Sequence, residues 1–281
     1  LDKVQPDSFW FPNYSYQLME AMRRETQLFF DHLVREDRSF LDLYRADYSF
    51  MNERLASHYG IPGVTGDEFR RVEYPNDQRN GILGHGSILV QSSLGNRTSP
   101  VLRGKWVMEV LLGTPPPPPP PGVPDLEETE GSIDGEVLTT RRRLEMHRAN
   151  PICASCHNVM DPIGLALDNF DVTGKWRIRE SSALLDTRST FYDGTEIETP
   201  ADLSRMLLKR PIPLVREFTA NLMAYAIGRR VEYFDMPTVR AIVRDAGEDD
   251  YRMSSLIMGV IMSDAFRKKD VAVPDDEVVT R

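Results

Sequence analysis

Seven consecutive prolines, at positions 115–121, constrain the fold of this 281-residue chain more than any other feature. Proline fixes φ and lacks an amide donor, so the run is predicted to form polyproline II rather than helix or sheet. At about 3.1 Å per residue it would span roughly 20 Å. We expect it to separate an N-terminal unit from the rest of the chain. It would act either as a stiff strut between two domains or as a strap that lies across the surface of one domain. Docking of a proline-binding module is the functional alternative.

Apolar residues recur at helical spacing on both sides of the prolines, which predicts a mainly α fold, a helical bundle. Helices are expected over 14–35, 39–59 and 101–112, then before Pro151, onward to about Pro162, and in further segments after Thr199, including 253–266. Between residues 176 and 198 the pattern alternates and contains Asp193-Gly194, which indicates a small β-hairpin.

The only two cysteines lie in Cys153-Ala154-Ser155-Cys156-His157. C-x-x-C-H is the sequence form of c-type haem attachment, in which two thiols add to the two vinyl groups of one porphyrin. The histidine that follows ligates the iron from the proximal side. The motif therefore predicts one covalently bound haem c, attached at Cys153 and Cys156, with His157 as the proximal ligand.

Three other chemistries remain open for this pentapeptide. A zinc site could add His147 and His157 to the two cysteines, although adjacent Cys156 and His157 are awkward to direct at one tetrahedral metal. A thioredoxin-type dithiol expects a strand before the C-x-x-C, whereas the preceding residues indicate a helix. A plain structural disulfide is the third.

These features divide the chain into four regions. Residues 1–113 form an N-terminal helical region, 114–135 a polyproline strut and acidic linker, and 136–210 a haem c-binding region with the small hairpin. Residues 211–281 form a C-terminal helical region. The predicted fold class is accordingly a helical bundle with a cytochrome c-like haem-binding region.

Composition excludes several partners. With 41% hydrophobic and 27% charged residues, the chain is typical of globular proteins. A net charge of −9 argues against nucleic acid or an anionic membrane surface, and no apolar run approaches the roughly 18 residues of a membrane span. Haem c is attached outside the bacterial cytoplasm, so we expect a periplasmic or otherwise extracytoplasmic protein, its export signal lying outside this chain. An acidic electron carrier would suit a basic redox partner.

The residues around the motif carry a resemblance that extends over nearly the whole chain. They are similar to secreted bacterial cytochrome c-like proteins made of tandem domains of unknown function, the families numbered 1592, 1588 and 1585, abundant in planctomycetes and acidobacteria. The blocks that carry it are residues 147–171 continuing to Trp176-Arg177, Arg97-Thr98-Ser99-Pro100 with Arg103-Gly104-Lys105-Trp106, Tyr225-Ala226-Ile227-Gly228-Arg229, and Asn52-Glu53-Arg54-Leu55-Ala56 with His58-Tyr59-Gly60. The resemblance implies haem binding and a longer precursor with further domains upstream.

The group opposite His157 decides the function of such a haem. Methionine or histidine there makes a closed electron-transfer site, whereas an open position permits peroxide or oxygen chemistry. The histidine candidates are His85, within a glycine-rich loop, and His147, with His58 behind them. Met160 is expected on the proximal side as packing at the haem edge, and the other methionines considered are Met206, Met223 and Met253.

Arginines are the expected partners of the two haem propionates, because a planar guanidinium matches a carboxylate bidentately. The candidates are Arg97, Arg103, Arg148 and Arg177. Each could equally be a solvated surface charge.

The sequence thus favours an extracytoplasmic c-type cytochrome that transfers electrons, alone or as the relay part of a larger redox protein or complex. The alternative is a haem enzyme with an open distal site, peroxidase-like or oxidase-like. A third alternative is a structural or interaction subunit in which the haem mainly stabilises the fold. No nucleophile motif, phosphate loop or dinucleotide fingerprint supports a hydrolase or kinase.

Overall fold

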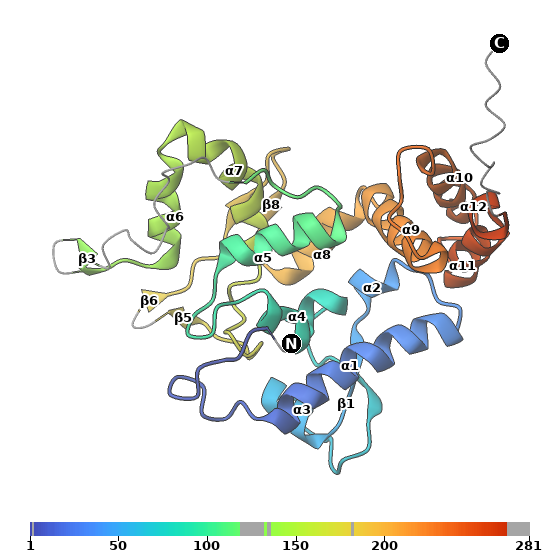
Figure 1. Ribbon diagram of the computed structural model, residues 1–281. Coiled ribbons are helices and arrows are strands. Elements are labelled where there is room, and N and C mark those ends of the chain that lie inside the picture. Colours follow the sequence, from blue (N-terminus) through green and yellow to red (C-terminus); the bar gives the residue numbers. More distant parts are fainter. Residues whose placement is uncertain (2, 119–131, 134–135, 181–182, 269–281) are drawn as a thin grey trace, which may run out of the picture.

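A computed structural model describes residues 1, 3–118, 132–133, 136–180 and 183–268 (Figure 1). The described part is mainly helical with short antiparallel strand pairs, which confirms the predicted helical-bundle class. Its helices are α1 (Tyr16–Arg35), α2 (Asp42–Arg45), α3 (Glu53–Tyr59), the 3-10 helix η1 (Gly81–Gly84), α4 (Gly86–Gln91), α5 (Pro100–Trp106), the π-helix η2 (Val107–Leu111), α6 (Thr140–Arg148), α7 (Pro151–Leu165), α8 (Pro200–Leu208), α9 (Ile212–Ile227), α10 (Met236–Gly247), α11 (Met253–Met262) and α12 (Asp264–Arg267). The strand pairs are β1 (Tyr48–Met51) with β2 (Arg70–Glu73), β3 (Ser132–Ile133) with β4 (Glu136–Val137), β5 (Arg179–Glu180) with β6 (Ala183–Leu184), and β7 (Ser189–Thr190) with β8 (Glu196–Ile197).

The first helix confirms the prediction made from its apolar spacing. Ser15 precedes α1 in an extended conformation, and its hydroxyl accepts a hydrogen bond from the Leu18 amide at 3.2 Å. This cap satisfies one of the amides that a helix start leaves unpaired. The apolar stripe is buried in the structure, as Met22, Phe29 and Leu33 show.

The prediction of a single helix over 39–59 is wrong. The segment folds as α2, β1 and α3, and β1 pairs with β2 so that Tyr48 lies opposite Glu73. Asn52 starts α3 by accepting a hydrogen bond from the Leu55 amide at 3.1 Å, and Gly60 ends it in the left-handed conformation, with φ 74°. A strand partner about 20 residues downstream therefore overrides the helical spacing of the apolar residues.

The predicted hairpin is confirmed, since β7 and β8 flank the turn at Asp193-Gly194. The expected end of the cysteine-bearing helix at Pro162 is wrong, because α7 continues to Leu165. A proline in the last turn removes one helical hydrogen bond and leaves little helix to distort beyond it. The predicted 253–266 helix is interrupted at Ser263, which separates α11 from α12 and caps the latter.

Close packing on α5 fixes the position of α7. Gly104 of α5 lies against the carbonyl of Met160, and Gly164 of α7 lies against the carbonyl of Pro100. A β-carbon at either glycine would overlap these backbone atoms. The two antiparallel helices can therefore approach backbone to backbone, and α7 is held from Met160 to its end.

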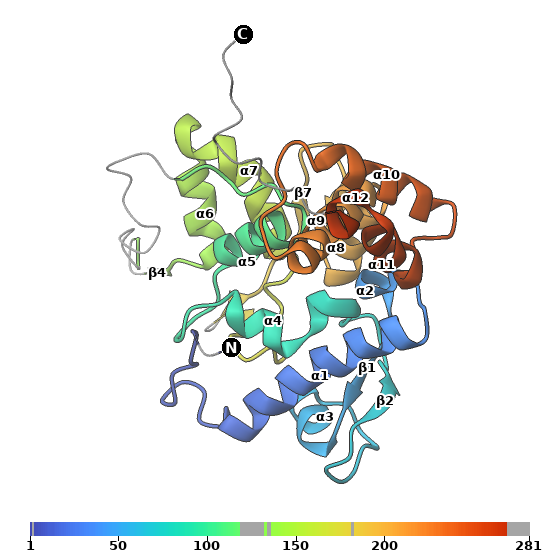
Figure 2. The same ribbon diagram turned by 45° about the vertical axis from the view of Figure 1, so that its right-hand side comes forward.

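One apolar core joins helices from the N-terminal, cysteine-bearing and C-terminal regions. Phe29 of α1, Ile163 of α7, Leu203 of α8 and Val239 of α10 all belong to it and are fully buried. In Figures 1 and 2, α2 lies beside α8, and α1 runs toward α11. A second, smaller core lies between α1, α3 and β1.

The polyproline prediction falls mostly outside the described residues. Positions 115–118 carry neither helix nor strand, and residues 119–131, with the end of the proline run and part of the acidic linker, are not described. Within the described ranges, no helix has the length and apolar character needed to cross a membrane.

Candidate functional site

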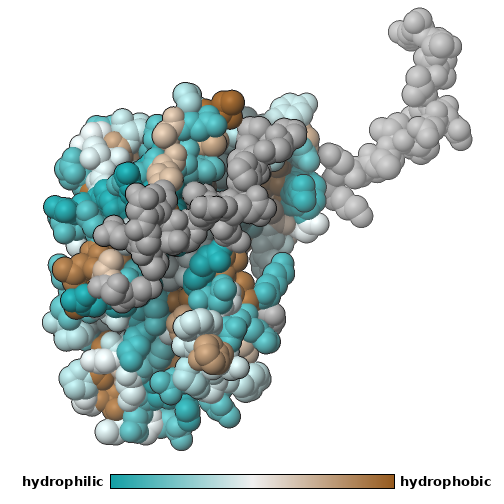
Figure 3. All heavy atoms as spheres, turned by 90° about the vertical axis from the view of Figure 1, so that its left-hand side faces the viewer, coloured by the Kyte–Doolittle hydropathy of each residue, from teal (hydrophilic) through white to brown (hydrophobic). Residues whose placement is uncertain are grey.

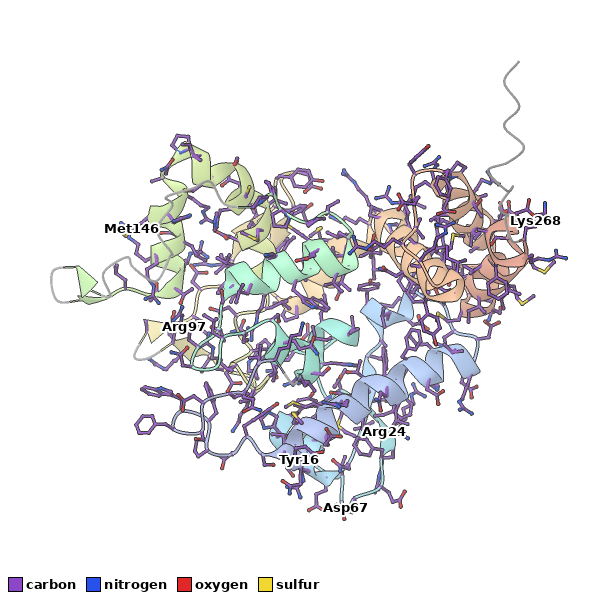
Figure 4. All side chains as sticks on the ribbon, viewed as in Figure 1. Tyr16, Arg24, Asp67, Arg97, Met146 and Lys268 are labelled. Carbon is purple, nitrogen blue, oxygen red and sulfur yellow. The ribbon has the colours of Figure 1, made fainter. Side chains whose placement is uncertain are left out.

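The C-x-x-C-H motif begins the second helix of a hairpin formed by α6 and α7. Asn150 caps α7 by accepting a hydrogen bond from the Ile152 amide at 3.0 Å, and Pro151 occupies the first helical position. Both residue types favour a helix start. The motif therefore lies in the first two turns of α7, on the side of the molecule marked by Met146 in Figure 4.

Both cysteines are accessible from solvent and carry free thiols. Cys153 and Cys156 are three residues apart on α7, so their side chains share one face of the helix. Each is half-buried, whereas the neighbouring Ile152 is 63% exposed. The surface on this side of the molecule mixes hydrophilic and hydrophobic patches (Figure 3).

The imidazole of His157 is fixed by a buried carboxylate. Its Nδ1 atom lies 2.8 Å from Oδ1 of Asp161, whose side chain is completely buried. The other oxygen of that carboxylate lies 3.3 Å from a guanidinium nitrogen of Arg148. A carboxylate at Nδ1 is the arrangement that places the proton on Nδ1 and leaves Nε2 as the nitrogen able to bind a metal.

His147 lies directly beside this assembly. The centroids of the His147 and His157 rings are 4.6 Å apart, and the ring planes meet at 64°. Partial burial, together with the neighbouring His157, lowers the pKa of His147 below its ordinary value. Of the histidines predicted as distal candidates, His147 is the one that the structure brings to the motif, and its ring contacts that of His157 edge to face.

His85 lies away from the cysteine motif, in a buried position against α1 and β1. Its ring is completely buried, with Nδ1 3.0 Å from the hydroxyl of Thr26 and Nε2 3.4 Å from that of Ser49. Burial, with Arg79 nearby, lowers the pKa of His85 to about 3, so the ring is neutral. These partners belong to α1 and β1, and the structure does not bring His85 to the cysteines.

The remaining histidine candidate, His58, and the four methionine candidates occupy structural positions. Nε2 of His58 lies 2.9 Å from the carbonyl oxygen of Thr173. Met160 packs on Gly104 of α5, while Met223 and Met253 are buried in the main core. Met206, with Met108, lines a cavity of about 240 Å³ that also touches α7 at Val159 and Ile163.

Two of the predicted propionate arginines hold the turn that follows α7. Arg103 is completely buried, and its guanidinium donates to the carbonyl oxygens of Leu167, Phe170 and Asp171 at 2.6–2.8 Å. Arg177 donates to the carboxylate of Asp168 at 2.8 Å.

The other two arginines, Arg148 and Arg97, are half-buried and lie elsewhere. Arg148 is the one that the structure joins to the His157 assembly, through Asp161. Arg97 lies on the loop before α5, on the same side of the molecule as Met146 (Figure 4). The four candidates therefore do not converge on one point.

Two features of the site were not predicted. Asp161 stands four residues after His157 on one helix, a spacing that the sequence displays and that could have identified it. A polar cavity of about 790 Å³ also lies between the α6–α7 hairpin and the β7–β8 hairpin, lined by Arg141, Arg148, Asn158, Arg188 and Tyr192 among others.

The zinc alternative finds no ligand set in the described part of the chain. No group of three or more histidine, cysteine, aspartate or glutamate side chains is placed there to hold a metal ion. The motif therefore offers two thiols and one imidazole nitrogen along a single helix, a set that suits a bound macrocycle better than a tetrahedral ion.

Family models match the chain in three consecutive segments. Residues 1–61 match "Protein of unknown function (DUF1592)", residues 79–180 match "Protein of unknown function (DUF1588)", and residues 193–266 match "Protein of unknown function (DUF1585)". The cysteine motif lies in the second segment. Comparison with curated proteins and with solved structures found no match. The chain therefore belongs to the proteins that carry these three domains of unknown function in tandem.

Proposed function

We propose that this chain is a c-type cytochrome that carries one haem, attached through thioether bonds to Cys153 and Cys156, and that it transfers electrons. The observation that carries the proposal is the motif's geometry: two free thiols on one accessible helix face, followed by an imidazole whose Nδ1 is already bound by Asp161. This arrangement supports attachment of a porphyrin and ligation of its iron by Nε2 of His157.

Each residue of the assembly has a distinct part in this proposal. The thiols of Cys153 and Cys156 would form the covalent bonds, and His157 would ligate the iron on the proximal side. Asp161 would fix the orientation of the imidazole, while Arg148 balances the buried carboxylate. A bound haem c supplies a one-electron couple whose potential depends on its ligands and surroundings.

The proposal carries two consequences for the cell. Haem c is attached outside the bacterial cytoplasm, so the protein would act in the periplasm or another extracytoplasmic space. Electron transfer also requires a redox partner protein, either separate or in a larger complex.

Attachment is tested by exporting the protein from a host that matures c-type cytochromes. The double variant Cys153→Ala/Cys156→Ala should lose all haem that resists acid extraction. The variant Ser155→Ala, which changes an exposed residue between the two cysteines, should keep it. Equal haem retention in both variants would contradict the attachment.

The reaction class is tested on the haem-loaded protein by optical spectroscopy. A six-coordinate, low-spin spectrum that carbon monoxide and cyanide leave unchanged is the expected result for electron transfer. Rapid binding of carbon monoxide to the reduced protein would instead favour the haem enzyme with an open distal site.

A further inference from the structure

A groove between α9 and α10 is lined by three arginines, of which Arg244 pairs with Asp245 at 2.9 Å. Its volume is about 580 Å³, and its lining includes Arg216 of α9 with Arg240 and Arg244 of α10. Arg240 and Arg244 are four residues apart, so they project from the same face of the helix. Ile212 and Val243 give the groove an apolar floor.

Arg216 also lines the neighbouring cavity of about 240 Å³. That cavity adds Lys209 and Arg210 from the end of α8, and its walls include the apolar side chains of Met206 and Pro213. The shared arginine places the two hollows next to each other. We call Lys209, Arg210, Arg216, Arg240 and Arg244 the basic stripe.

The basic stripe carries more positive charge than its surroundings balance. Asp193 and Glu248 line the two hollows, and Asp245 pairs with Arg244 at 2.9 Å, so three acidic residues accompany the five basic ones. Among the described residues, neither Arg216 nor Arg240 forms an ion pair, and Arg210 reaches Asp193 only at 3.9 Å. Arg216 is half-buried, so its charge is partly removed from water without a counter-charge. Such a group gains most from a ligand that brings carboxylates.

The apolar floor distinguishes between acidic ligands. A protein segment with alternating acidic and apolar side chains can pair its carboxylates with the guanidinium groups and bury its apolar residues against Val243 and Met206. A nucleic acid strand offers no comparable apolar side chains, and the net charge of −9 on the whole chain repels a long polyanion.

We propose that the basic stripe binds an acidic, partly apolar segment of a partner protein. The local charge is opposite to that of the chain as a whole, from which a basic partner was expected. The smaller cavity also touches Val159, one turn beyond Cys156 on α7. A partner seated on the stripe would therefore reach the helix that carries the cysteine motif, but binding itself does not depend on the haem.

The proposal is tested by fluorescence anisotropy on the full chain, with a labelled peptide of alternating glutamate and leucine as the probe. We expect saturable binding that weakens as ionic strength rises. The variant Arg216→Gln/Arg240→Gln should bind about tenfold more weakly or worse. The matched control Arg230→Gln/Arg267→Gln changes two exposed arginines outside the stripe and should bind as the original chain does. Circular dichroism should show the same fold and melting temperature for all three proteins.

Several outcomes would overturn the proposal. One is absence of binding, and another is an equal loss of affinity in both double variants, which would indicate unspecific charge attraction. Equally tight binding of single-stranded DNA, with the same dependence on Arg216 and Arg240, would assign the stripe to nucleic acid. Salt-sensitive dimerisation that the Arg216→Gln/Arg240→Gln variant abolishes would assign it to a second copy of the chain. The variant Cys153→Ala/Cys156→Ala should bind the peptide as the original chain does, because the stripe does not include the cysteines, and loss of binding there would also overturn the proposal.

Discussion

Nδ1 of His157 lies 2.8 Å from the carboxylate of Asp161, one turn further along the same helix. The carboxylate is completely buried and is also paired with Arg148. A charged acceptor at this nitrogen strengthens the imidazole as a ligand and fixes the direction of its other nitrogen. In the proposed haem site, this relationship would prepare His157 to bind the iron.

The variant Asp161→Asn tests that relationship in the haem-loaded protein. A neutral amide makes His157 a weaker donor, so the oxidised iron loses stabilisation and the midpoint potential should rise. Haem attachment should persist, because the cysteines are unchanged. Spectroelectrochemical titration measures the potential. The control Asp245→Asn, which alters an exposed aspartate on α10, should leave it unchanged, and an unaltered potential in Asp161→Asn would contradict the account.

Arg103 should be among the side chains most important for stability. Its guanidinium donates to three backbone carbonyls in the turn after α7, and two of these hydrogen bonds are buried. Truncation to alanine leaves these acceptors unpaired and opens a cavity, so we expect a loss of about 3–5 kcal/mol in the free energy of unfolding. Lysine keeps the charge but cannot span the same acceptors, and should lose part of that amount.

Urea denaturation followed by circular dichroism measures this effect. The exposed Arg244 provides the control, because its replacement by alanine should change the free energy of unfolding by no more than about 0.5 kcal/mol. Similar losses at the two positions would show that Arg103 has no special structural role.

Close packing of α5 on α7 predicts a strong effect of Gly104→Ala. The added methyl group would overlap the carbonyl of Met160, so the two helices must separate. The expected cost is about 1–3 kcal/mol of unfolding free energy. Lys105→Ala, on an exposed position of the same helix, is the control and should melt as the original chain does. A Gly104→Ala protein of unchanged stability would mean that α7 is not held in this way.

Glu25 should make stability depend on pH. Burial raises the pKa of Glu25 to about 7 from its ordinary 4.5, against the opposing effect of hydrogen bonds from Tyr59 and Ser49. The folded chain therefore holds this proton to higher pH than the unfolded chain. The associated stabilisation is complete below about pH 4.5 and is lost as pH rises to about 7. Over this window the loss amounts to about 3 kcal/mol at most.

The variant Glu25→Gln removes this titration. Burial lowers the pKa of His85 to about 3, which makes stability fall as pH drops below about 6.5 and so opposes the effect of Glu25. The informative quantity is therefore the difference between variant and original chain, measured by urea unfolding at pH 5 and pH 8. The free energy of unfolding of Glu25→Gln minus that of the original chain should be more positive at pH 8 than at pH 5. A difference that does not vary with pH, as expected for the exposed control Glu20→Gln, would contradict the account.

Local sequence patterns predicted the helix that carries the cysteine motif better than they predicted the fold around it. The C-x-x-C-H spacing and Pro151 are local, and the structure has a helix there with both thiols on one face. Asp161 was not predicted, although its spacing from His157 is equally local. The path from Ser39 to Tyr59 was predicted wrongly, because aromatic residues such as Tyr48 suit a strand as well as a helix and the deciding partner β2 lies about 20 residues away.

Non-local packing also decided the roles of single polar residues. Arg103 is charged and would be expected at the surface, but the carbonyls of a turn more than 60 residues later converge on it. His85 stands in a glycine-rich loop that could approach a cofactor, and instead its ring is enclosed by hydroxyls from α1 and β1. Neither arrangement is visible in the spacing of nearby residues.

The central claim is that Cys153 and Cys156 carry one haem. Peptide mass spectrometry of the exported, acid-extracted protein tests it most directly, since thioether-bound haem survives extraction and adds its mass to the peptide that contains both cysteines. We predict one haem on that peptide in the original chain and none in Cys153→Ala/Cys156→Ala. A peptide of unmodified mass, or one that differs only by a disulfide, from a host that matures c-type cytochromes would contradict the account.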